Sequence, residues 1–150
     1  MTSRTKKIII RVSVLVLVVV IALGMLIGAV VSGWRAAIRS AIEGGALQTV
    51  KSIAAAEAHY FKGHKGTYGT FDQLVEDGFD ARFSGEVPNV DGYVYTLKVI
   101  SKTTNRPSSY VLNADPYAGS AGRNHLYCDS SDNLIRVNAD RPAGPNDPAP

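Results

Sequence analysis

The chain has 150 residues, enough for one domain, and a formal net charge of +3. Four cations precede the first long apolar run, and the residues after it carry 12 Lys and Arg against 13 Asp and Glu. The positive balance is therefore a membrane-topology signal, and we expect no nucleic-acid partner. The single cysteine, Cys128, excludes an internal disulfide. It is expected to be a small core residue, with an intermolecular bridge as the alternative.

Residues 1–11 form a basic segment, and residues 12–31 form an apolar run that predicts a transmembrane helix. Twenty helical residues span roughly 30 Å, the thickness of the hydrocarbon core of a bilayer. The preceding cations predict a cytoplasmic N-terminus, a single pass through the cytoplasmic membrane, and an extracytoplasmic remainder. A cleaved signal peptide is the alternative, but the apolar core of a signal peptide is usually about 7–15 residues long.

Three residues near this run are candidates for contacts in the membrane. Gly24 and Gly28 are four residues apart, so they share one helix face and would let a second helix approach closely. The alternative is the general abundance of glycine in transmembrane helices. Trp34 follows the run at the position of an interfacial aromatic residue, which predicts an anchor at the membrane surface.

The amphipathic pattern that follows predicts a helix continuing to Gly63, which supplies a stop signal just after Lys62. Its apolar positions recur near helical spacing, whereas its charged residues fall mostly off the stripe, Glu57 among them. The stripe consists of Ile38, Ile42, Val50, Ile53, Ala54, Ala58 and Phe61. Gly44 and Gly45 predict a kink or a frayed turn, because each glycine costs about 1 kcal/mol relative to alanine inside a helix.

The rest of the chain predicts a short helix and then strands. Thr70 and Gln73 form a capping-box pattern, with Gly78 as the stop. Alternating or β-rich segments predict strands at residues 92–100, 109–116, 125–128 and 134–137. Residues 139–150 are rich in Pro, Gly and Asp, and we expect a disordered tail. The fold class is therefore α+β: a long helix, transmembrane and then amphipathic, packed on a small antiparallel β-sheet.

No arrangement of residues indicates catalysis, a cofactor or a metal centre. The three histidines, His59, His64 and His125, lack metal-site spacing and are expected in surface or capping roles. The acidic turn Asp129–Asp132 offers oxygen ligands for calcium, but a hairpin turn with side-chain hydrogen bonds is the simpler interpretation. We therefore do not expect an enzyme.

Two stretches carry a resemblance to a known family. "AAAEAHYFKGHKGTYGTFDQLVEDG" resembles the end of the long helix and the start of the following loop in type IV pilins and pseudopilins. "VLNADPYAGSAGRNHLYCDSSDNLIRVN" is similar to their last hairpin. The resemblance covers about residues 38–137 and implies a pilin-like extracytoplasmic domain over 32–138. It also implies a structural or assembly role in the cell envelope, with other pilin-like subunits or assembly proteins as partners.

The sequence departs from that family at the start of the apolar run. The glycine of the prepilin-peptidase site is missing, and no acidic residue occurs before Glu43. In the family, an early glutamate pairs with the neighbouring subunit inside the membrane and sets the register. This chain is therefore expected either to stay anchored or to assemble through other contacts. An anchored module that binds a ligand or a protein outside the membrane is the alternative function.

Overall fold

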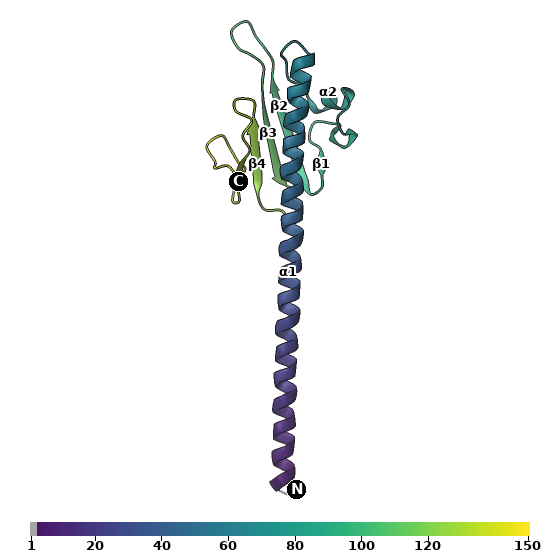
Figure 1. Cartoon of the computed structure of the whole chain (residues 1–150), viewed down its shortest axis with the longest axis vertical. Helices are drawn as coiled ribbons and strands as arrows, with labels where there is room; N and C mark the ends of the chain where they lie inside the picture. Colours follow the sequence, from purple (N-terminus) through teal and green to yellow (C-terminus); the bar gives the residue numbers. More distant parts are fainter. Residues whose placement is uncertain (1–2) are drawn as a thin grey trace. The chain divides into compact units, whose positions relative to one another are not determined.

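The computed structural model describes the backbone of residues 3–150 and the side chains of residues 15–26, 28 and 30–150. The predicted cytoplasmic cations, at positions 4, 6, 7 and 11, lie outside the described side chains. The first element is the helix α1, Ser3–Gly63, which ends at the predicted glycine (Figure 1). The chain divides into two compact units, Met1–Ile38 and Arg39–Pro150, and each is described by itself.

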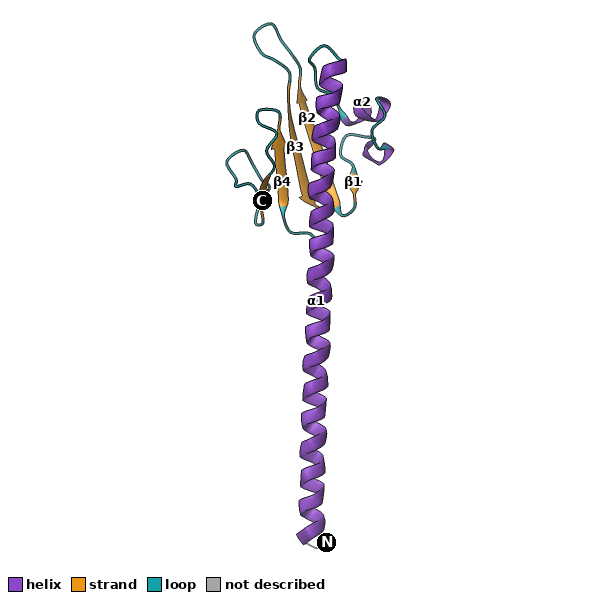
Figure 2. Cartoon of the chain, viewed as in Figure 1, coloured by secondary structure: helices purple, strands orange, loops and turns teal. Residues whose placement is uncertain are grey.

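In the second unit, α1 packs along one face of the sheet and buries a single stripe of side chains (Figure 2). The predicted stripe is wrong near its end, where Ala58 is exposed and Glu57 is buried instead. The stripe follows alternating steps of four and three residues, which keep it on one helix face. Its fully buried positions are Ala46, Val50, Ile53, Glu57 and Tyr60.

The paired glycines do not interrupt this helix. Gly44 and Gly45 both have helical backbone within α1, so the predicted fraying is absent. Neighbouring residues on the buried face stabilise the helix here, because Ala46 is 2 % exposed and Ile42 packs against the core. Tertiary packing of an amphipathic face outweighs the low helix propensity of two glycines.

The sheet is an antiparallel meander of five strands in sequential order. Pro116 ends the third strand, and the alternation predicted for the second strand is confirmed, with Tyr93 and Tyr95 buried and Thr96 exposed. The α+β class is also confirmed. The strands are β1 (Asn89–Val90), β2 (Tyr93–Ile100), β3 (Ser109–Pro116), β4 (His125–Asp129) and β5 (Arg136–Asn138).

The core lies between α1 and this sheet and is rich in aromatic residues. Tyr93 and Tyr95 on β2 and Tyr110 on β3 are buried on the face that meets α1. The Tyr93 hydroxyl donates to the Asn124 carbonyl at 2.8 Å, and the Tyr110 hydroxyl donates to the Asn133 side chain at 2.6 Å. The rings of Tyr93 and Tyr110 therefore add apolar contact without leaving their hydroxyls unpaired.

The connection between α1 and β1 contains α2 (Phe71–Glu76) and the 3-10 turn η1 (Ala81–Phe83). The capping box of α2 is confirmed: Thr70 Oγ1 accepts from the Gln73 N–H, and Gln73 Oε1 accepts from the Thr70 N–H at 2.9 Å. The sequence pattern predicts neither the turn η1 nor the strand β1. Phe83 is nevertheless buried, and its ring packs edge-on against Tyr95.

The C-terminal part also differs from prediction. The last strand begins at Arg136, two residues late, because Leu134 donates its N–H to the Asp132 carboxylate and so belongs to the turn. Residues 139–150, for which the sequence predicts disorder, contact the sheet at two points. Ala143 is 5 % exposed, its carbonyl accepts from the Asn113 side chain, and the Pro148 carbonyl accepts from the N–H of Val137 on β5.

Candidate functional site

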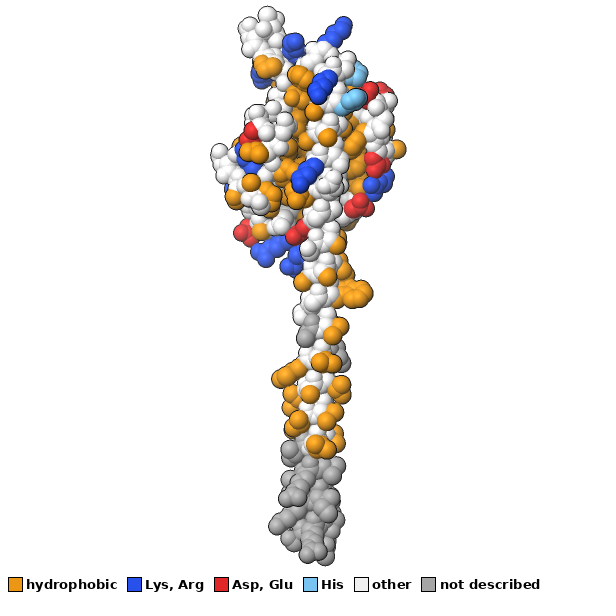
Figure 3. Space-filling view, in the orientation of Figure 1, with side chains coloured by type: hydrophobic (Ala, Val, Ile, Leu, Met, Phe, Trp, Pro, Cys, Tyr) orange, Lys and Arg blue, Asp and Glu red, His pale blue; other side chains and the backbone are white. Residues whose placement is uncertain are grey.

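The apolar part of α1 is the most conspicuous surface of the first unit. One described helix, near the N-terminus, is long and apolar enough to cross a bilayer. The described large apolar side chains of residues 15–34 are all exposed, with Leu15 at 66 % and Met25 at 72 % (Figure 3). Exposed apolar surface of this extent is unfavourable in water, so the segment needs an apolar environment.

The glycines predicted to contact a second helix lie within this segment. A Cβ atom added at Gly24 or Gly28 would meet no atom within 4 Å, so both backbones are open to an approaching partner. They are four residues apart on α1 and therefore lie on the same helix face. Trp34 is 69 % exposed, as an interfacial anchor would be before it meets lipid. Both assignments stay predictions.

Glu57 is the buried charged group that the sequence pattern does not reveal. Its side chain is fully buried between α1 and the loop that precedes α2. Oε2 accepts the N–H of Gly69 at 3.0 Å, whereas Oε1 has no hydrogen-bond partner among the described residues. Burial raises the pKa of Glu57 to about 7, and the Gly69 hydrogen bond opposes that rise. The carboxyl therefore titrates near neutral pH.

The residues around Glu57 explain why its environment is closed. Gly69 packs so tightly on the Tyr60 ring that a Cβ atom there would lie 3.1 Å from it. Tyr68 stacks edge-on against Tyr110 with ring centroids 4.9 Å apart, and burial together with the nearby Glu57 raises the pKa of the Tyr68 phenol. The sequence did contain a signal, because position 57 continues the four-and-three spacing of Val50 and Ile53.

Glu43 performs a similar task at the other end of the domain. Its Oε1 accepts the N–H of Arg123 at 2.9 Å, and its Oε2 accepts from the Asn124 side-chain amide at 3.0 Å. Two glutamates of α1 thus accept backbone N–H groups: Glu57 from the loop that directly follows the helix, and Glu43 from the loop between β3 and β4. The Glu43 contacts fasten the helix to a connection of the sheet.

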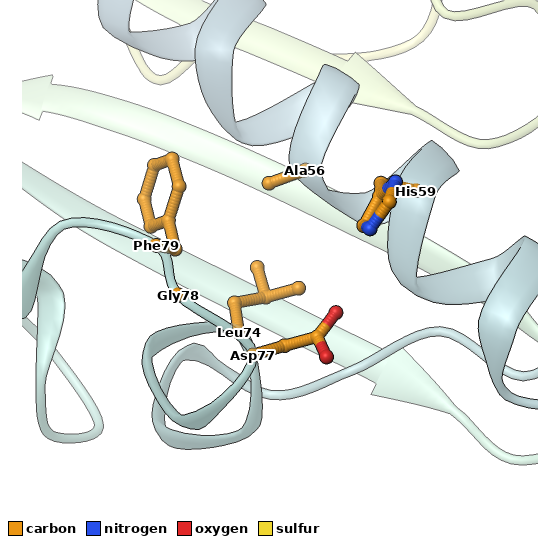
Figure 4. Close-up of a pocket in the computed structure, with 6 residues that line it drawn as sticks. All are labelled: Ala56, His59, Leu74, Asp77, Gly78 and Phe79. Carbon is orange, nitrogen blue, oxygen red and sulfur yellow. The ribbon is translucent and has the colours of Figure 1, made fainter.

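A small hollow lies between α1 and α2 (Figure 4). Its volume is about 170 Å³, and its polar groups are the His59 imidazole and the Asp77 carboxylate, opposite one another across it. One imidazole and one carboxylate are fewer ligands than a metal site requires. The hollow is lined by Ala56, His59, Leu74, Asp77, Gly78 and Phe79.

The other histidines contact neighbours within the domain. His64 stacks on Tyr60, with ring centroids 3.7 Å apart, and its Nδ1 donates to the Tyr60 carbonyl at 3.0 Å. This contact covers the end of α1, as a capping role predicts. His125 donates from Nδ1 to the Asp115 carboxylate across β3 and β4.

The acidic turn after β4 is held by its own hydrogen bonds, as the simpler interpretation predicts. Asp129 Oδ1 accepts from the N–H of Ser131 at 2.8 Å, and Asp132 pairs with Arg136 at 2.6 Å. The Arg136 hydrogen bonds lower the pKa of Asp132. Because these carboxylates already have partners, the turn does not resemble an open calcium site. In the described part of the chain, no three metal-binding side chains lie together.

Cys128 is confirmed as a core residue. It is fully buried on β4, and burial raises the pKa of its thiol.

Comparisons of the chain with protein-family models, with curated proteins and with solved structures find no match. The likeness that the structure supports is one of arrangement, a long N-terminal helix packed on an antiparallel sheet as in pilins.

Proposed function

We propose that this chain is a membrane-anchored, pilin-like structural or assembly protein of the cell envelope, of the minor-pilin or pseudopilin kind. The proposal rests on one observation: α1 supplies both an exposed apolar segment and the spine of an α+β domain. A segment of this length is most stable in a bilayer, where a helix satisfies its own backbone hydrogen bonds. The basic N-terminus would remain in the cytoplasm, and the domain would lie outside.

The polar ties within the domain support a structural role. Glu43 binds the loop between β3 and β4, and Glu57 binds the loop that follows α1, so a force transmitted along α1 would load hydrogen bonds as well as apolar contacts. The other ionisable side chains described above are engaged in turns, caps and ion pairs.

Lateral assembly would use the membrane segment. Gly24 and Gly28 present open backbone on one face, which permits close packing of two helices. The chain lacks an acidic residue before Glu43, so register would depend on this packing and not on a buried ion pair. The same absence favours the alternative function, an anchored monomer that binds a ligand or a protein through its sheet and loops.

Imaging of sheared surface material with an antibody to residues 62–138 tests the proposal. A structural subunit should label long polymers, and the double variant G24L/G28L should abolish them while the protein stays in the membrane fraction. The control is A22L, a similar small-to-large change on the opposite helix face. Label confined to membrane fractions in every sample would contradict polymerisation and favour the anchored binder. A mature chain that begins near Trp34 would contradict the anchor itself.

A further inference from the structure

The end of the domain at which α1 finishes carries a group of exposed cations. Lys62 and Lys65 lie at the end of α1 and just after it, and Lys102 and Arg106 lie in the connection between β2 and β3. All four are exposed, and we call them the basic cap. Figure 3 shows blue side chains gathered at this end of the domain.

The two segments of the basic cap are fixed beside each other. The N–H of Tyr68 donates to Ser108 Oγ at 3.2 Å, and that hydroxyl donates to the Ile100 carbonyl at 3.1 Å. The Phe61 and Tyr68 rings lie 4.6 Å apart, so the loop after α1 is held at the base of the β2–β3 connection. The two pairs of cations consequently lie at the same end of the domain (Figure 1).

The cap is unusual in its charge balance. The segments 58–71 and 92–114, which build it, contain no Asp or Glu, and Lys98 on β2 adds a further exposed cation. None of the cap residues forms an ion pair within the described part of the chain. The arginines that do form ion pairs lie elsewhere in the domain: Arg82, Arg123, Arg136 and Arg141. The nearest acidic side chain on the α2 side, Asp77, faces His59 and not the cap residues, and a surface with cations of one sign attracts polyanions.

The shape of the basic cap and its exposed residues favour an anionic bilayer over a single-stranded nucleic acid. The end of α1 and the β2–β3 connection both project at the same end of the domain (Figure 1), which suits a flat surface rather than a strand lying in a groove. Most exposed residues there are polar or basic, and the exposed His64 ring already stacks on Tyr60, which leaves little aromatic surface on which a single-stranded nucleic acid could stack. Clusters of about four to eight Lys and Arg bind bilayers that contain anionic lipids.

We propose that the basic cap docks this domain on the surface of a bilayer rich in anionic phospholipids. The contact is electrostatic, reversible and sensitive to salt, because no apolar side chain of the cap is available to enter the hydrocarbon. The docking is independent of polymerisation.

Co-sedimentation of the full chain, reconstituted in neutral phosphatidylcholine nanodiscs, with added vesicles tests this inference. Vesicles with roughly 30 % phosphatidylglycerol should bind the nanodiscs and pure phosphatidylcholine vesicles should not, with binding lost as salt rises from about 50 to 500 mM. K62Q/K65Q/K102Q/R106Q should weaken binding at least about 100-fold, since each cation contributes roughly a factor of five.

The controls separate charge at the cap from charge in general. K51Q removes an exposed, unpaired cation from the same helix away from the cap and should leave binding unchanged. K62R/K65R/K102R keeps the charges and should bind like the wild type. Equal binding to neutral vesicles, or binding that survives the quadruple substitution, would overturn the inference. Cap-dependent binding to duplex DNA without binding to anionic vesicles would also overturn it, in favour of a nucleic acid.

Discussion

Replacing Glu57 by Gln should remove most of the pH dependence of the domain's stability near neutral pH. The carboxyl has an ordinary pKa of 4.5 in the unfolded chain and a pKa of about 7 in the fold. Because the folded pKa is the higher one, the fold is fully stabilised below pH 4.5 and loses stability as pH rises to about 7. At about 1.4 kcal/mol per pH unit, the loss amounts to about 3 kcal/mol.

The measurement is urea unfolding of the full chain in nanodiscs, followed by near-ultraviolet circular dichroism of the tyrosines at pH values from about 4 to 8. The free energy of unfolding of E57Q should change with pH over this range only through the other titratable groups, which the wild type also has. E76Q, which removes an exposed carboxylate from α2, is the matched control and should retain the wild-type slope. Equal slopes for wild type and E57Q would refute the reasoning.

Three further changes test the packing around α1 and the sheet. Thr70→Ala removes the cap of α2 and should lower the free energy of unfolding by about 1 kcal/mol; an unchanged urea midpoint would argue against the capping box. Gly69→Ala should cost about 1–3 kcal/mol, because its Cβ atom would crowd the buried Tyr60 ring. Gly63→Ala has open space around it and should cost much less in the same titration. Deletion of 139–150 should lower stability by about 1–2 kcal/mol, whereas a tail without native contacts could be removed without effect.

Much of the fold follows from local patterns in the sequence. The end of α1 at Gly63, the capping box of α2 and the limits of β3 are predictable, because each depends on a residue with one strong local preference. The strand β1 and the turn η1 escape prediction because they are only two and three residues long and depend on tertiary pairing. The order of residues 139–150 likewise depends on contacts with β3 and β5.

The candidate sites show the same division. Spacing alone predicts Gly24, Gly28 and Trp34, and the structure adds that all three are accessible. The residue type of Glu57 predicts exposure, because a charged residue on an amphipathic helix is normally exposed, although its spacing continues the buried stripe. Its burial depends on a loop N–H that reaches it from twelve residues away, and no local pattern encodes that contact. The basic cap escapes prediction for a related reason, since its cations come from separate segments.

The burial of Cys128 has a practical consequence for mapping helix neighbours. The chain contains a single thiol, and that thiol is fully enclosed in the core with a raised pKa. Any disulfide that forms after a cysteine is introduced at position 24 or 28 would therefore join the introduced cysteines and not the enclosed native one. Site-directed crosslinking and spin labelling can thus begin from the natural chain, without first replacing the native cysteine.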